Sequence, residues 1–139
     1  MFSKILSAND GSEHAFKALS VAIAIAQQNN SELHMASVEE IDYMPELIND
    51  IREETGTAAR RYHGVLQRAR SMAKDANVEV HTHVLVGHPV RDIVRLAGDL
   101  KIDLLVVGAV GHSGGYERLI GSRASHLVPL APCLAPVVK

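Results

Sequence analysis

The chain has 139 residues, a length that favours one domain around a single sizeable core. Hydrophobic residues make up 47% of it and charged residues 22%, as is usual for a globular protein. The formal net charge of −2 excludes a general electrostatic attraction to nucleic acid or to anionic lipid. The single cysteine, Cys133, excludes an intramolecular disulfide and suits a reducing compartment.

The sequence contains no apolar run of the about 18 residues that a membrane-spanning helix needs. The nearest candidate, residues 127–138, is short and is broken by three prolines. At the N-terminus, Lys4 is followed by only two apolar residues before a polar stretch, so we expect no signal peptide. We therefore predict a cytoplasmic protein with no membrane insertion and no nucleic-acid partner.

Apolar patterning predicts strands and helices that alternate along the whole chain. Strands are expected where short apolar runs end in turn-forming residues, and helices where apolar residues recur every three or four positions. In chain order the sequence predicts a strand at 4–10, a helix at 11–30, a strand at 31–39, a helix at 62–76, a strand at 78–87, a helix at 88–101, a strand at 102–108, a short helix at 121–128 and a candidate strand at 133–139.

This order predicts an α/β fold with a single open, mostly parallel five-stranded sheet and helices on both faces, as in Rossmann-like proteins. The run 102–108, IDLLVVG, does not alternate between apolar and polar residues, which is typical of a strand covered on both faces. The acid-rich stretch 39–54 is expected to be a mobile loop at the edge of a site or plain solvated coil. No repeat or linker divides the chain, so we expect one domain over residues 1–139.

Residues 108–122, GAVGHSGGYERLIGS, hold five of the ten glycines of the chain. The stretch leaves the carboxyl end of a buried strand, where ligands of open parallel sheets sit, and ends at the start of a helix. The free N–H groups and the dipole of a helix start favour phosphate. Gly108 and Gly111 would let the backbone approach a ligand, Gly121 would permit an unusual turn, and Ser122 would add a hydroxyl donor. The alternative is a glycine-rich surface connection.

Better-known phosphate loops do not match this stretch. The dinucleotide pattern G-x-G-x-x-G should follow the first strand, whereas this G-x-x-G follows the fourth. The Walker pattern needs a lysine, and residues 108–122 contain none. The SGG at 113–115 is similar to the loop of ATP-dependent ligases, but it is followed by YER, and its position after the fourth predicted strand does not fit that loop.

The spacing of Gly108, Gly111 and Gly121-Ser122 resembles the G-2x-G-9x-G-(S/T) motif of ATP-binding universal stress proteins. The resemblance covers the whole chain: ANDGSEHAFKAL, VGHPVRDIVRLA, IDLLVVGAVG and APC have counterparts in that family at the expected places. The chain departs from the pattern near its end, where Pro129 is expected to shorten the last helix and Leu134 follows Cys133 in place of the usual proline.

The resemblance implies an adenine nucleotide, ATP or else AMP or ADP, as the ligand. Asp10, after the first strand, would face adenine and ribose, and the backbone at Val38 would read the edge of the adenine. For Asp10 the alternative role is a helix or turn cap, and for Val38 a plain place in the strand core, which is compatible with adenine recognition.

For the phosphates, the resemblance implies that Gly108 and Gly111 approach the ribose and the α-phosphate. The β- and γ-phosphates would contact Gly121, Ser122 and the amide of Arg123. His112 is a further candidate for a hydrogen bond to phosphate, and the side chains of Arg118 and Arg123 either add charge-assisted contacts or stay solvated. Mg²⁺ or Mn²⁺ would accompany the triphosphate, held mainly by phosphate oxygens and water.

Two other groups of side chains favour simpler interpretations. His81 and His83 lie two positions apart on one face of a predicted strand, a pattern that fits either half of a metal site or a polar outer face; the second is favoured because further ligands are missing nearby in the sequence. The arginines between 60 and 70 are not interleaved with aromatic residues, so a solvated helix face is favoured over a nucleic-acid patch. This set comprises Arg60, Arg61, Arg68 and Arg70.

The sequence predicts a nucleotide-binding stress-response or signalling protein with slow or no hydrolysis, because it shows no P-loop lysine and no evident catalytic base. The alternatives are an interaction module, empty or AMP-bound, that regulates a transporter or another partner, and an enzyme of the wider adenine-nucleotide α-hydrolase-like group. The family resemblance also implies a homodimer, formed either by the final strands, with Val137 and Val138 packed against the second subunit, or by another surface. Pro136 has no N–H to donate, so we expect it at a sheet edge or where pairing is interrupted.

Overall fold

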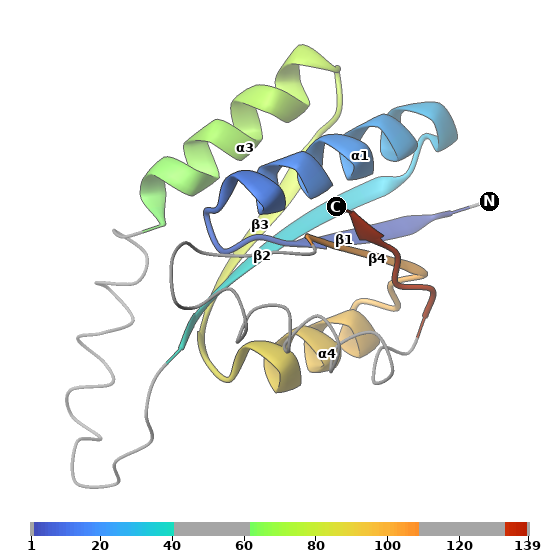
Figure 1. The fold of residues 1–139 in the computed structure, drawn as a ribbon. Helices are drawn as coiled ribbons and strands as arrows, with labels where there is room; N and C mark the ends of the chain where they lie inside the picture. The colour runs from blue at the N-terminus through green and yellow to red at the C-terminus, as the bar shows by residue number, and fades with distance from the viewer. Residues whose placement is uncertain (1, 41–61, 109–132, 139) are drawn as a thin grey trace, which may run out of the picture.

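The computed structural model describes residues 2–40, 62–108 and 133–138, and within them five strands and three helices (Figure 1). The elements are β1 (Lys4–Ala8), α1 (Glu13–Asn29), β2 (Glu32–Glu40), α3 (His63–Asp75), β3 (Val80–Gly87), α4 (Pro89–Asp99), β4 (Leu104–Gly108) and β5 (Val137–Val138). The predicted helix at 121–128 and the acid-rich stretch beyond Glu40 lie outside the described residues.

The five strands form one parallel sheet in the order β3-β2-β1-β4-β5. β1 lies at its centre, where Ile5 pairs with Leu33 of β2 on one side and with Leu104 of β4 on the other. Helices α1 and α3 cover one face and α4 covers the other (Figure 1). The predicted fold class, an open five-stranded α/β sheet of Rossmann-like type, is confirmed.

Each face of the sheet has its own apolar core because neighbouring residues of a strand point to opposite sides. On the side of α1 and α3, Ile5 of β1 packs with Leu19 of α1 and Ala69 of α3. On the side of α4, the next residue, Leu6, packs with Ile93. Residues 104–107 of β4 are all buried, which confirms the prediction that this strand is covered on both faces.

Local signals explain where the helices begin and end. The Ser12 hydroxyl accepts the N–H of Ala15 at 3.1 Å and so caps the start of α1. At the other end, Asn30 adopts a left-handed conformation, with φ of 56°, and its N–H bonds back to Ala26. Pro89 stands in the first turn of α4, where a helix needs no N–H donor.

The last strand is present but short. Val137 and Val138 pair with Val107 and Gly108 of β4, and the Pro136 carbonyl accepts the Val107 N–H at 3.3 Å. A proline is tolerated here because β5 is the outermost strand of the described sheet and Pro136 contributes only its carbonyl to the pairing with β4. The predicted strand at 133–139 is therefore confirmed in its second half.

Two buried serines of neighbouring strands provide a matched test of this packing. The Ser37 hydroxyl donates to the Asn9 carbonyl at 2.7 Å, whereas the Ser7 hydroxyl has no hydrogen-bond partner in the described part of the chain. We expect Ser37→Ala to lower the free energy of unfolding by about 1–3 kcal/mol, because it leaves a buried carbonyl without its donor. Ser7→Ala should change it little or raise it.

Urea unfolding of both variants beside the unsubstituted protein measures the difference. A cost of Ser7→Ala equal to that of Ser37→Ala would contradict the assignment of these two hydroxyls.

Candidate functional site

The strand order reverses at the centre of the sheet, between β1 and β4. From β1 the chain runs into α1 and on to β2, whereas β4 pairs with the opposite edge of β1. In open parallel sheets the carboxyl ends of such a strand pair border a crevice where ligands bind. The described parts of this crevice are the β1–α1 turn, the end of β4 and the end of β2.

Asn9 connects the end of β1 to β2. Its N–H donates to the Ala36 carbonyl at 2.8 Å, and its carbonyl accepts the Ser37 hydroxyl. Its buried side chain accepts the Gly11 N–H at 2.8 Å and contacts the Met35 sulfur at 3.4 Å. Asn9 was not among the residues predicted from the sequence, although an Asn two positions before a glycine is a typical turn signal.

The next three residues form the turn that begins α1. The Asp10 carboxylate accepts the Ser12 N–H at 3.0 Å, so Asp10 takes the turn-capping role that was one of its two predicted roles. Gly11 has φ of 90°, and a Cβ there would lie 3.2 Å from Val65 of α3. This turn therefore requires glycine for its conformation.

Gly108 lies against the first turn of α1. A Cβ at this position would come within 3.0 Å of the carbonyl carbon and oxygen of His14 and 3.2 Å from the nitrogen of Ala15. The glycine is needed because β4 and α1 approach each other so closely. The sequence had predicted a close approach of this backbone to a ligand; the structure adds a packing requirement at the same residue.

The backbone of Val38 points toward the β1 side of β2. The Ala36 carbonyl accepts from Asn9, and backbone groups alternate sides along a strand, so the N–H and carbonyl of Val38 point the same way as those of Ala36. The β1–β2 pairing ends at Ala36, because β1 turns away into α1. The Val38 carbonyl accepts the Tyr62 hydroxyl at 3.4 Å. No local signal could have indicated Tyr62, since the two residues are 24 positions apart.

Arg68 of α3 joins the start of α1 on the outer side of the molecule. Its guanidinium donates two hydrogen bonds to the Glu13 carboxylate, at 2.8 and 3.1 Å, and stands 3.9 Å above the ring of Phe16. These bonds lower the pKa of Glu13 and raise that of Arg68. Both side chains are exposed, so the pair positions α3 beside α1 more than it stabilises the fold.

The predicted phosphate-binding half of the site lies outside the described residues. This holds for Gly111, His112, Gly121, Ser122 and Arg123, and likewise for Arg118. Of the predicted residues, the structure places Asp10, Val38 and Gly108 at the carboxyl ends of three adjacent strands, β1, β2 and β4. Within the described ranges, no three His, Cys, Asp or Glu side chains converge as metal ligands would.

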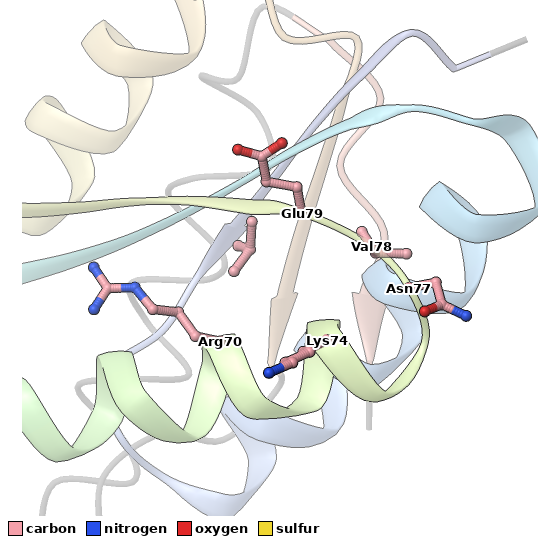
Figure 2. A pocket seen from close by; sticks show the side chains of 6 residues that line it. Arg70, Lys74, Asn77, Val78 and Glu79 are labelled. Atoms are coloured by element: carbon pink, nitrogen blue, oxygen red, sulfur yellow. The ribbon is translucent and has the colours of Figure 1, made fainter.

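A pocket of about 430 Å³ lies elsewhere, where the end of α3 meets the start of β3 (Figure 2). Arg70 and Lys74 line it from α3, and Figure 2 shows the Glu79 carboxylate pointing away from both. Because it borders the amino end of a strand, it is separate from the crevice at the carboxyl ends. Arg70 is exposed and donates to the Thr82 hydroxyl at 2.8 Å.

The whole chain, residues 1–139, matches the model of the universal stress protein family. The chain belongs to this family. Among curated relatives, a universal stress protein of Methanocaldococcus jannaschii, MJ0531, is 32% identical in an alignment of 149 residues. The alignment covers 100% of this chain and 83% of the relative.

Of the described helices, none combines the length and the hydropathy that a membrane span requires.

Solved structures of universal stress proteins show the same fold. UspA from Lactobacillus plantarum superposes with a TM-score of 0.83 at 28% identity, over 99% of this chain and 98% of that one. A universal stress protein solved in complex with cAMP superposes with a TM-score of 0.77 at 27% identity, over 99% of this chain and 97% of that one.

The fit of Gly108 against α1 can be tested with a second glycine. Gly108→Ala should lower the free energy of unfolding by about 1–3 kcal/mol, because the new methyl group overpacks against the His14 carbonyl. Gly98→Ala, at an exposed position of α4 with no atom within 4 Å of the new Cβ, should raise it by about 0.5–1 kcal/mol. Thermal and urea unfolding measure both effects. Equal effects of the two substitutions would show that Gly108 is not closely packed.

Proposed function

We propose that this universal stress protein binds adenine nucleotides, ATP foremost, at the crevice between β1 and β4 and acts by nucleotide-dependent regulation in a stress response or in signalling. The observation that carries the proposal is the position of Gly108. The G-2x-G-9x-G-S spacing begins at this residue, which ends β4 beside the first turn of α1. The similar structure in complex with cAMP supports an adenine nucleotide as the ligand class.

The adenine would lie beside the end of β2. The Val38 carbonyl can accept a hydrogen bond from the adenine amino group, and the Val38 N–H can donate one to the adjacent ring nitrogen. The Tyr62 hydroxyl now bonds to this carbonyl, so adenine would replace it there. Guanine presents a carbonyl oxygen where adenine has its amino group, and two facing acceptors would disfavour it. The Asp10 carboxylate, beside the same crevice, would accept a ribose hydroxyl.

The phosphates would follow the glycine loop. Gly111 would approach the α-phosphate, with His112 as a further donor, and the β- and γ-phosphates would bind Gly121, Ser122 and the amide of Arg123. Mg²⁺ or Mn²⁺ would be held by phosphate oxygens and water, since the described residues provide no converging set of metal ligands.

Nucleotide titrations test the site and the base preference together. The unsubstituted protein should bind ATP more tightly than GTP in calorimetry. Gly121→Val should abolish binding, because a β-branched side chain would occupy phosphate space and resist a left-handed conformation. Tyr62→Phe is the matched control: it removes the competing hydroxyl and should leave ATP affinity equal or raise it.

Equal ATP affinity in the unsubstituted protein and Gly121→Val would remove the phosphate loop from the proposal. A large loss of affinity in Tyr62→Phe would show that the tyrosine contacts the nucleotide in place of competing with it.

Regulation is favoured over catalysis because the described part of the crevice presents mainly backbone groups. The only ionisable side chain that we place against the nucleotide from the described residues is Asp10, and its carboxylate already caps the β1–α1 turn. We therefore propose that hydrolysis is slow or absent, well below the roughly 1–10³ s⁻¹ of typical enzymes.

A purified protein that hydrolyses several ATP molecules per second, and loses this activity in Ser122→Ala, would instead support an enzyme. Purified protein that carries no nucleotide and binds none would support the interaction module.

We also propose a homodimer that pairs β5 with its copy. Val137 of β5, the outermost strand of the described sheet, is 40% exposed, and Leu134, which bridges to Leu104 just before β5, is 62% exposed. Val138 instead packs on the core beneath α1. Val137→Asp should therefore dissociate the dimer, because it places a charge in the apolar contact. Ser71→Asp, which adds the same charge on the exposed side of α3, should leave it intact. Sedimentation velocity measures both, and a monomeric unsubstituted protein would exclude the homodimer.

A further inference from the structure

Four ionisable side chains gather on the α4 side of the sheet, across the β2–β3 pair. Glu32 and His34 lie on β2, and the register places His81 opposite His34 and His83 opposite Ala36. Because Ala36 packs in the core beneath α4, residues that share its face point to the same side. We call Glu32, His34, His81 and His83 the histidine cluster.

His34 is the centre of the cluster and is buried, with 7% of the residue exposed. Its Nδ1 lies 2.9 Å from Nε2 of His83, and its Nε2 lies 2.9 Å from a Glu32 carboxylate oxygen. The ring of His81 packs on the ring of His34, with 4.9 Å between the centroids. Both nitrogens of a buried imidazole are thus engaged by titratable groups.

These contacts restrict how many protons the cluster can hold. In the neutral form, Nε2–H of His34 donates to Glu32, and Nε2–H of His83 donates to Nδ1 of His34. One added proton converts His34 to an imidazolium that donates from both nitrogens, while His83 shifts its own proton to Nδ1 and accepts. A second added proton would place two N–H groups face to face and two positive charges side by side. The 2.9 Å contact would then break.

We propose that His34 and His83, oriented by Glu32, form a pH-sensitive latch between β2 and β3. The latch stays closed with no added proton or with one, and a second proton opens it. β3 is the outermost strand on this side of the described sheet, so opening the latch loosens an edge of the molecule (Figure 1). The Val38 backbone lies four residues along β2 from His34, on the strand that the latch holds.

Other described charged groups near this face form no contact that could replace the His34–His83 hydrogen bond. From β1, Lys4 acts on Glu32 through its charge. The side of α4 that packs on this face buries Val90, Ile93 and Ala97. In the described part of the chain, the cluster has no hydrogen bond or ion pair with the other charged residues near this face, namely Glu79, Arg91, Asp92, Arg95, Asp99 and Asp103.

The direction of the pKa shifts sets the range of pH. Burial first, and then the charges of His34 and His81, lower the pKa of His83 below its ordinary value of 6.5. The unfolded chain therefore binds a proton more readily than the folded one, so the stability is complete above about pH 6.5 and falls as the pH drops toward the lowered pKa. The hydrogen bond from His34 lowers the pKa of Glu32, whose contribution is lost only below its ordinary value of 4.5. The pH range in which His83 loses its contribution to stability is thus separate from that of Glu32.

The full chain, in buffer with a metal chelator, allows a direct test. Imidazole ¹⁵N shifts, followed by NMR from pH 8 to pH 5, should show His34 and His83 titrating together in more than one step. The exposed His63 of α3 serves as an internal reference. Two independent single-step curves for His34 and His83 would overturn the latch.

Thermal unfolding separates a switch from a simple structural contact. A glutamine at position 83 can donate to a neutral His34 or accept from a charged one, but it does not take up a proton. We therefore expect the melting temperature to fall less between pH 7.5 and pH 5.5 in His83→Gln than in the unsubstituted protein. His63→Gln is the control and should keep the original dependence on pH. Parallel profiles for His83→Gln and the unsubstituted protein would overturn the proposal.

Discussion

The hydrogen bonds of Asn9 connect the β1–α1 turn to the end of β2, the two described segments that border the proposed nucleotide site. Backbone and hydroxyl contacts join this residue to Ala36 and Ser37 of β2, and its side chain closes the turn at Gly11. Together with the β1–β2 pairing, which ends at Ala36, this buried residue places the start of α1 relative to the end of β2.

The described part of the crevice presents mainly backbone groups, and this bears on what the crevice is suited to do. Gly11 and Gly108 allow the chain to bend and to pack where a side chain would be strained or would collide. Amides and carbonyls held by such packing can recognise a nucleotide with little reorganisation. They do not shuttle protons, however, so the same features that favour binding do not favour catalysis. This composition supports the proposed regulatory role of the nucleotide over a catalytic one.

The fold was largely predictable because its signals are local and periodic. The apolar run 102–108 indicated a strand covered on both faces, and residues 104–107 are all buried. Ser12 caps α1 and Pro89 stands in the first turn of α4, positions that are typical of these residue types. The candidate site was predictable only in part. Asp10, Val38 and Gly108 were identified through a spaced glycine motif and a family resemblance, whereas the contacts of Asn9 with β2 and of Tyr62 with Val38 join residues that are distant in the sequence.

The sequence by itself determined the alternation of strands and helices, the turn that begins α1 and the family to which the chain belongs. These depend on residue type and short-range spacing, which local backbone preferences and side-chain periodicity translate directly into structure. Only the tertiary structure decided that Gly108 lies against His14 and that His34 lies between Glu32 and His83. The parallel register of β2 and β3 and the approach of α1 to β4 create these contacts, and both arise from packing among segments far apart along the chain.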